Sequence, residues 1–123
     1  MTAAASNDPL PTEIRVLKDR SGLTVAFDDG NSFSLSAEYL RVESPSAEVK
    51  GHGANTAVTV PGKRHVTIAN LEAVGNYAVR IIFDDGHDTG LYSWRLLHRL
   101  GRDHDTIWQT YLDKLAAEGK GRD

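Results

Sequence analysis

The sequence predicts an α+β domain with an antiparallel β-hairpin sheet, a short helix after the third strand and two C-terminal helices. Two turns carry this prediction, Phe27-Asp28-Asp29-Gly30 and Phe83-Asp84-Asp85-Gly86, each between alternating apolar residues. Asp-Gly is a strong hairpin signal because glycine readily adopts the positive φ that such turns need. Sustained helical spacing of apolar residues is confined to the chain after Ser93, which places the longer helices together at the C-terminal end.

The first half of the chain predicts three antiparallel strands and a short helix. Residues 13–18 alternate apolar and charged side chains, residues 23–27 form the next strand, and residues 33–35 return after the turn. Ser36 can cap a short helix over residues 37–41. Pro45 ends this helix, because proline disfavours helical geometry in the residue before it.

The second half repeats this order. Alternation resumes at residues 65–71, residues 74–77 form a turn, and residues 78–83 with residues 88–91 form the second hairpin. Tyr92 follows on the return strand, where we expect it to be exposed. The two hairpins match at a constant spacing along the chain, which indicates an internal duplication.

Two helices complete the predicted fold. Ser93 caps a helix that runs to Leu100 and ends at Gly101. The final helix begins at Asp103 or Asp105 and runs to about residue 118. Its apolar residues repeat at helical spacing: Ile107, Trp108, Tyr111, Leu112 and Leu115.

The length and composition predict one ordinary globular domain. We expect residues 1–11 to be a disordered lead, residues 12–118 to form the domain and residues 119–123 to be a polar tail. The 123 residues contain no cysteine, which excludes disulfides and thiolate ligands, and the net charge of −3 argues against a nucleic-acid partner. No apolar run is long enough to span a membrane and no signal peptide is evident, so we expect a cytoplasmic protein. The oligomeric state stays open.

His87 is the most suggestive polar residue, because Asp84, Asp85 and Asp88 surround it. One interpretation is a divalent-metal site. The favoured interpretation is a solvated turn whose carboxylates accept hydrogen bonds from local amides. The pair Asp28-Asp29 occupies the same place in the first hairpin without a histidine, which supports the turn.

His52, between Gly51 and Gly53, is the second candidate. A zinc or iron site formed by His87, His52 and Asp85 is the minority hypothesis. Trp94 lies on an apolar helical stripe and is expected in the core. There is no Gly-x-Ser-x-Gly elbow and no phosphate-binding glycine loop, so hydrolase activity and nucleotide binding have no support.

Three motifs together bring a family resemblance. They are Ser-Pro-Ser-Ala-Glu-Val at residues 44–49, Gly-His-Gly at residues 51–53 and Asp-Gly-His-Asp-Thr-Gly-Leu-Tyr-Ser-Trp at residues 85–94. With them, the chain resembles the DUF971 family, related to the N-terminal domain of gamma-butyrobetaine hydroxylase, over about residues 11–100.

The resemblance implies that an inherited zinc site is lost. The hydroxylase domain holds zinc with three cysteines and one histidine, and the matching positions here are Ser44, Ser46, Val49 and His87. Zinc needs about four donors, and only the histidine is retained. We therefore expect Ser44 and Ser46 to replace the metal cross-link with loop hydrogen bonds.

The resemblance also implies a role without chemistry of its own. The oxygenase activity of the hydroxylases belongs to a separate catalytic domain, and family members are also attached to iron–sulfur carrier proteins. The preferred hypothesis is a non-catalytic accessory or binding module, whose partner is another protein. Its candidate surface residues are Arg41, Ser44, Ser46, His52, His87, Asp88, Tyr92 and Trp94. The alternatives are a metal-binding protein, linked to iron–sulfur protein maturation, and a small enzyme, which rests only on His87.

Overall fold

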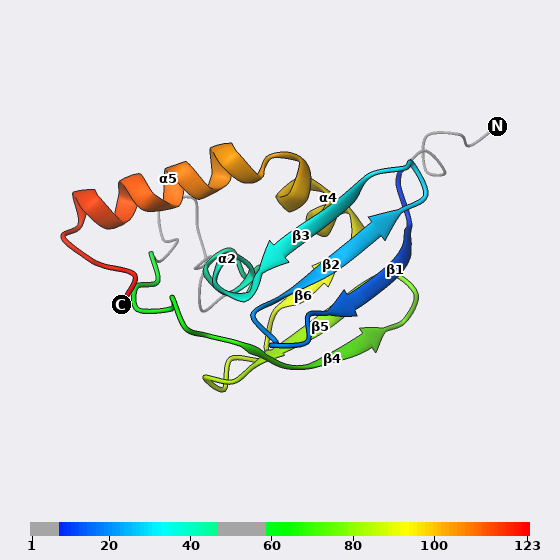
Figure 1. Cartoon of the computed structure of the whole chain (residues 1–123), viewed down its shortest axis with the longest axis horizontal. Coiled ribbons are helices and arrows are strands. Elements are labelled where there is room, and N and C mark those ends of the chain that lie inside the picture. Colours follow the sequence, from blue (N-terminus) through cyan, green and yellow to red (C-terminus); the bar gives the residue numbers. More distant parts are fainter. Residues whose placement is uncertain (1–7, 47–58) are drawn as a thin grey trace.

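The structure is a computed structural model that describes residues 8–46 and 59–123. These residues form two three-stranded antiparallel sheets and three helices (Figure 1), so the α+β prediction is confirmed. The first sheet and its helix are β1 (Pro11–Val16), β2 (Gly22–Phe27), β3 (Ser32–Ser36) and α2 (Ala37–Val42). The second sheet and the C-terminal helices are β4 (Ile68–Val74), β5 (Ala78–Phe83), β6 (Leu91–Ser93), α4 (Trp94–Arg102) and α5 (His104–Ala117).

The core lies between the two sheets and the helices. In each sheet the central strand, β2 or β5, alternates buried and half-buried positions and presents one face to the core. The innermost side chains of these two strands are Leu23, Val25, Phe27, Ile81 and Phe83, all at most 3% exposed. Figure 1 shows the β1–β3 sheet in front of the β4–β6 sheet, with α4 and α5 along one side.

The two halves repeat one local structure. In the first hairpin the Asp28 carboxylate accepts from the Leu10 amide, and the Asp28 amide donates to the Leu10 carbonyl. In the second hairpin Asp84 makes the same two bonds with Thr67. Each turn then ends in a glycine of positive φ, 89° at Gly30 and 91° at residue 86. The duplicated pattern in the sequence thus corresponds to two β-β-β-α units of the same design.

Both predicted serine caps are present. The Ser36 hydroxyl accepts from the Tyr39 amide at the start of α2, and the Ser93 hydroxyl accepts from the Leu96 amide at the start of α4. The predicted start of α5 is also found, with Asp103 at the N-cap position, although its carboxylate pairs with the preceding arginine and makes no side-chain cap bond.

Several predicted boundaries are wrong. β1 is Pro11–Val16 rather than residues 13–18, and β4 is Ile68–Val74 rather than residues 65–71. Gly101 does not end α4, which continues to Arg102; its missing side chain instead lets the helix lie against the Phe33 ring, 2.2 Å from where a Cβ would stand. The last strand is Leu91–Ser93 rather than residues 88–91. The carbonyl of Asp88 accepts from the Arg80 guanidinium instead of joining the ladder.

The two ends of the chain continue into the fold. β1 begins at Pro11, and residues 1–7 of the expected lead lie outside the described residues. In the predicted tail, the carbonyls of Gly121 and Arg122 accept from the amides of Gly62 and Arg64, at 3.0 Å in both cases. In the described ranges, no helix has the length and apolar character to cross a membrane.

Candidate functional site

A buried polar cross-link joins the two halves of the chain. We use this name for Ser44, Ser46, His87 and Thr89. The Ser44 hydroxyl lies 2.9 Å from Nε2 of His87, and the Ser46 hydroxyl lies 2.7 Å from the Thr89 hydroxyl. Ser44 is fully buried, Ser46 is 7% exposed and His87 is 6% exposed, whereas Thr89 lies at the exposed edge of the cross-link. The sequence interpretation that Ser44, Ser46 and His87 lie together therefore agrees with the geometry.

Neighbouring elements fix the two sides of the cross-link. Ser44 follows directly after α2, which is held to the second half by the Tyr92 hydroxyl donating to the Leu40 carbonyl at 2.5 Å. His87 follows the second hairpin turn, where its amide donates to the Asp85 carboxylate at 3.1 Å. The His87 carbonyl in turn accepts from the Phe83 amide. A helix end and a tight turn thus present the two side chains to each other.

The Ser44 hydroxyl has no space beside it. It accepts a 3.3 Å hydrogen bond from the Ser46 amide in addition to its contact with His87. A Cβ on Gly90 would stand only 2.5 Å from the Ser44 oxygen, so the backbone at residue 90 approaches the hydroxyl closely. A substrate carbonyl cannot reach such an oxygen, so the geometry does not suit a nucleophile.

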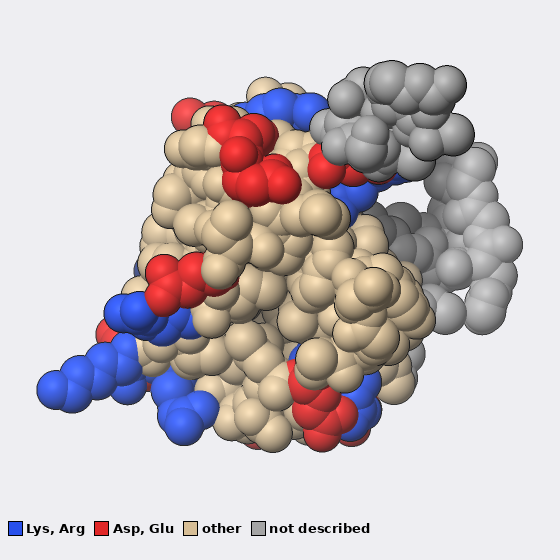
Figure 2. Space-filling model, turned by 90° about the vertical axis from the view of Figure 1, so that its right-hand side faces the viewer, with Lys and Arg blue, Asp and Glu red and all other residues tan. Residues whose placement is uncertain are grey.

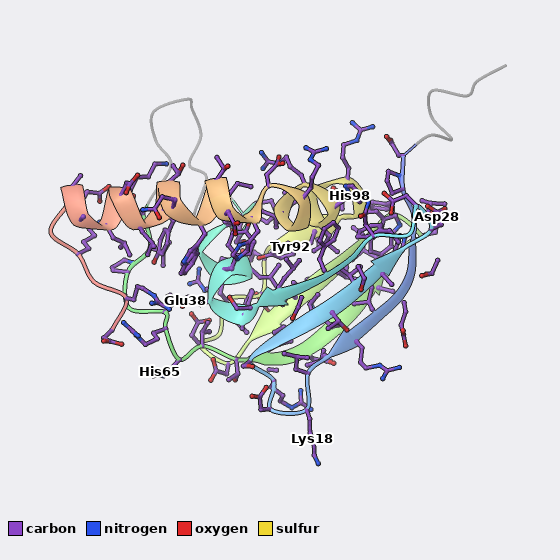
Figure 3. The ribbon with its side chains drawn as sticks, turned by 45° about the horizontal axis from the view of Figure 1, so that its top comes forward. Lys18, Asp28, Glu38, His65, Tyr92 and His98 are labelled. Carbon is purple, nitrogen blue, oxygen red and sulfur yellow. The ribbon has the colours of Figure 1, made fainter. Side chains whose placement is uncertain are left out.

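Tyr92 is not on the surface. The prediction that it is exposed is wrong, because the side chain is fully buried among the core residues. Burial raises the pKa of its phenol, against a smaller opposing contribution from the Ser44 hydroxyl. Figure 3 shows Tyr92 between the sheets and the helices. The strand does alternate, but its exposed face carries Leu91, which is 44% exposed, and its buried face carries Tyr92.

An ion cluster adjoins the cross-link. Oδ2 of Asp85 accepts from Nε of Arg41 at 2.9 Å and from Nζ of Lys63 at 2.6 Å. Burial opposes ionisation of Asp85, but the hydrogen bonds from Lys63, the His87 amide and Arg41 outweigh it and lower its pKa to about 2. Asp85 is thus a charged anchor for α2 and for the segment that carries Lys63.

The other acidic turn residues have structural partners. Asp84 accepts from the Thr67 amide, and Asp88 lies 3.5 Å from the Arg80 guanidinium. Trp94 packs partly buried against the core and donates its indole N–H to the Asn76 carbonyl at 2.8 Å. The bond from the His87 amide to Asp85 is of the local kind that the turn interpretation expects, whereas Arg41, Lys63 and Thr67 reach these carboxylates from distant parts of the chain.

The metal hypothesis stays a prediction. His52 lies outside the described residues, so its distance from His87 is not part of the structure. Within residues 8–46 and 59–123, no group of three or more His, Cys, Asp or Glu side chains could hold a metal ion. There, Asp85 is engaged by two cations and Nε2 of His87 by a hydroxyl.

The family can be assigned from the sequence as a whole. The model of a family described as gamma-butyrobetaine hydroxylase-like, N-terminal, matches residues 14–98. The chain belongs to this family. Its matched span includes both hairpins, α2 and the first half of α4, so all four residues of the cross-link lie within the part of the chain that matches the GBBH-like N-terminal family.

Solved structures share the same fold. One relative, solved by NMR in solution, is 43% identical, with a TM-score of 0.81 over 95% of this chain and 92% of its own. A second NMR structure is 46% identical, with a TM-score of 0.80 over 95% of this chain and 87% of its own. A crystal structure of a DUF971 protein of unknown function from Acidithiobacillus ferrooxidans ATCC 23270 is 40% identical, with a TM-score of 0.61 over 74% of this chain and 91% of its own. No curated protein matches the chain.

Sequence reasoning missed two residues of the site and one residue of the equivalent contact in the first half of the chain. Thr89 and Lys63 carried no motif of their own, although Thr89 lies inside the run of residues 85–94. The third is His98, which lies 2.8 Å from Asp29, the first-hairpin counterpart of Asp85. The repeated Asp-Asp-Gly turns were the available signal. They predict that the second aspartate of each turn, Asp29 or Asp85, makes an equivalent contact with the rest of the molecule.

Proposed function

We propose that this GBBH-like N-terminal domain is a non-catalytic accessory module that binds another protein. The observation that carries the proposal is the buried polar cross-link. Ser44 and His87, the most unusual residues in the sequence, are hydrogen-bonded to each other in the interior of the molecule. They fasten the fold, and the family's description as the N-terminal part of hydroxylase-like proteins fits a module that acts beside a catalytic partner.

The exposed apolar side chains favour a protein partner. Leu91 on β6 is 44% exposed, and Tyr77 at the start of the same β5–β6 ladder is 56% exposed. The backbone of Tyr77 is bonded to that of Trp94, and Arg80 of β5 is opposite Leu91, so one ladder carries both side chains. Figure 2 faces the end of the molecule with the β4–β5 turn and shows charged groups around a broad uncharged area. By the register of the ladder, Leu91 shares a face with Arg80 and Tyr77 continues the opposite face, so the two side chains are separate candidate contacts. Exposed aromatic side chains such as Tyr77 are enriched at protein contacts.

Affinity capture from the native cell extract after chemical cross-linking tests the proposal. The variants are Leu91→Asp and Leu10→Asp, since Leu10 is also exposed, at 53%, but belongs to the first hairpin. We expect one protein to be recovered in stoichiometric amount with the unaltered domain and with Leu10→Asp, and to be lost with Leu91→Asp. Recovery that is absent throughout, or equal for both variants, would contradict a partner surface on the β5–β6 ladder.

A further inference from the structure

Arg41 has an unused donor at the edge of the buried cross-link. Its Nη1 atom is enclosed and, in the part of the chain that the structure describes, is the buried side-chain nitrogen or oxygen without a hydrogen-bond partner. A guanidinium is always charged, and an unmet donor on a charged group costs more than the ~1–3 kcal/mol of a neutral one. Such a donor calls for an acceptor beyond the described residues, such as water or an anion.

The carboxylate of Asp85 does not accept from this donor in the structure. Oδ2 of Asp85 already accepts from Nε of Arg41 and Nζ of Lys63, and Oδ1 accepts from the His87 amide. Two full positive charges therefore share a single negative one. The three side chains together carry a net charge of about +1 in a place where little water screens it.

Solvent reaches this cluster from one side. The side chain of Arg41 is 12% exposed and that of Lys63 is 23% exposed. The neighbouring cation Arg122 is not available, because it pairs with both oxygens of Glu38 at 2.8 and 2.7 Å. Arg41 and Lys63 thus remain as two adjacent cations that share one partner.

We propose that Arg41 and Lys63 form a binding site for a single oxyanion group, a carboxylate or a phosphate. The partly exposed guanidinium of Arg41 donates to one oxygen of the anion, and Lys63 uses donors left over from its bond to Asp85. Asp85 holds both cations in place and is a positioning residue. Charge-assisted hydrogen bonds of this kind are the stronger ones in proteins, and guanidinium groups match the geometry of planar oxyanions. The site is independent of the protein-binding surface proposed above.

An NMR titration of the full chain tests the site. The probes are sodium phosphate and sodium acetate, each added at constant ionic strength with sodium chloride. We expect saturable shifts of the Arg41 Nε–H and His87 amide signals at millimolar concentrations for one of the two probes, which also identifies the anion class. Shifts that rise linearly without saturation for both probes would overturn the proposal.

Two matched lysine variants separate a site from general charge effects. Lys63→Gln removes one cation of the site, and Lys18→Gln removes the charge of a lysine that Figure 3 shows projecting from the β1–β2 turn, far from α2. We expect Lys63→Gln to weaken binding about fivefold or more, Lys63→Arg to retain it, and Lys18→Gln to leave it unchanged. Equal weakening by Lys63→Gln and Lys18→Gln would show that only the net charge matters and would overturn the site.

Discussion

At the scale of single residues, the hydroxyl oxygen of Ser44 takes part in two hydrogen bonds. It pairs with Nε2 of His87 and accepts the Ser46 amide, while the absence of a side chain at Gly90 leaves it just enough space. A buried hydroxyl with satisfied partners contributes modestly to stability, but removing it leaves its partners unsatisfied. The arrangement fastens the end of α2 to the second hairpin.

Ser44→Ala should lower the free energy of unfolding by about 1–3 kcal/mol, because it removes the hydroxyl that is hydrogen-bonded to Nε2 of His87 and accepts from the Ser46 amide. Urea denaturation followed by tryptophan fluorescence measures the change. Ser34→Ala is the matched control, since Ser34 is exposed on β3. Equal stability of the two variants would mean that the Ser44 hydroxyl does not fasten the fold.

Asp85 gives the molecule a specific dependence on acid. Its folded pKa, about 2, lies below the usual value, so its contribution to stability is present above about pH 4 and is lost as the pH falls through 2. Because the pair is partly exposed, we expect this contribution to be on the order of 1 kcal/mol.

The measurement is the difference in stability between the unaltered protein and Asp85→Asn at a series of pH values. We expect the unaltered protein to be the more stable from pH 7 down to about pH 4, and the difference to shrink between pH 4 and pH 2. A difference that stays constant over this range would show that the charge of Asp85 is not involved.

At the scale of elements, each helix secures the hairpin of the other half. Arg41 of α2, which follows the first hairpin, pairs with Asp85 in the second hairpin turn. His98 of α4, which follows the second hairpin, pairs with Asp29 in the first hairpin turn, and its ring lies edge-on against Phe27. Figure 3 shows His98 close to the turn that carries Asp28. This crossed arrangement makes each unit depend on the other.

The substitution Gly101→Ala tests whether helix propensity or packing dominates at this position. The two effects change the stability of the protein in opposite directions. Propensity alone favours alanine in a helix by about 1 kcal/mol. The Cβ would stand 2.2 Å from the Phe33 ring, and overpacking of this kind costs about 1–3 kcal/mol. We therefore expect lower stability in urea. In a Phe33→Ala background the same change should instead stabilise; a stabilising effect in both backgrounds would contradict the close packing of α4 on β3.

Local signals predicted most elements but could not predict their tertiary partners. The serine caps, the glycine turns and the helical stripe of α5 depend on neighbours within a few residues, and the sequence therefore identified them. The burial of Tyr92 and the contact of Gly101 with Phe33 depend on segments far away along the chain. The meeting of Ser44 with His87 was accessible only through the family resemblance, since no spacing rule connects residues so far apart.

At the scale of the whole molecule, the last residues close the structure. Arg122 pairs with both oxygens of Glu38, a carboxylate whose side chain is only 6% exposed, and stacks over the Trp108 ring at 5.3 Å. The backbone around Arg122 is hydrogen-bonded to the segment that contains Lys63. What the sequence presents as a polar tail thus connects α2, α5 and the ion cluster.

Arg122→Gln should reduce the free energy of unfolding by about 1–3 kcal/mol, because it leaves the buried carboxylate of Glu38 without its cation. The matched control is Arg95→Gln, which removes an arginine whose side chain is 78% exposed and pairs with Asp8 on the surface. Thermal unfolding of both variants measures the effect. A similar small change in both would indicate that the C-terminal residues do not contribute to the stability of the domain.

The most direct test asks whether a metal fastens the two halves. Thermal unfolding is recorded with and without a strong chelator, and the zinc content of untagged protein is measured by elemental analysis. We expect the midpoint temperature to be unchanged by the chelator and the zinc content to stay below about a tenth of an equivalent, because hydrogen bonds hold Ser44 to His87. A midpoint that falls on chelation, together with about one zinc per chain, would contradict this account.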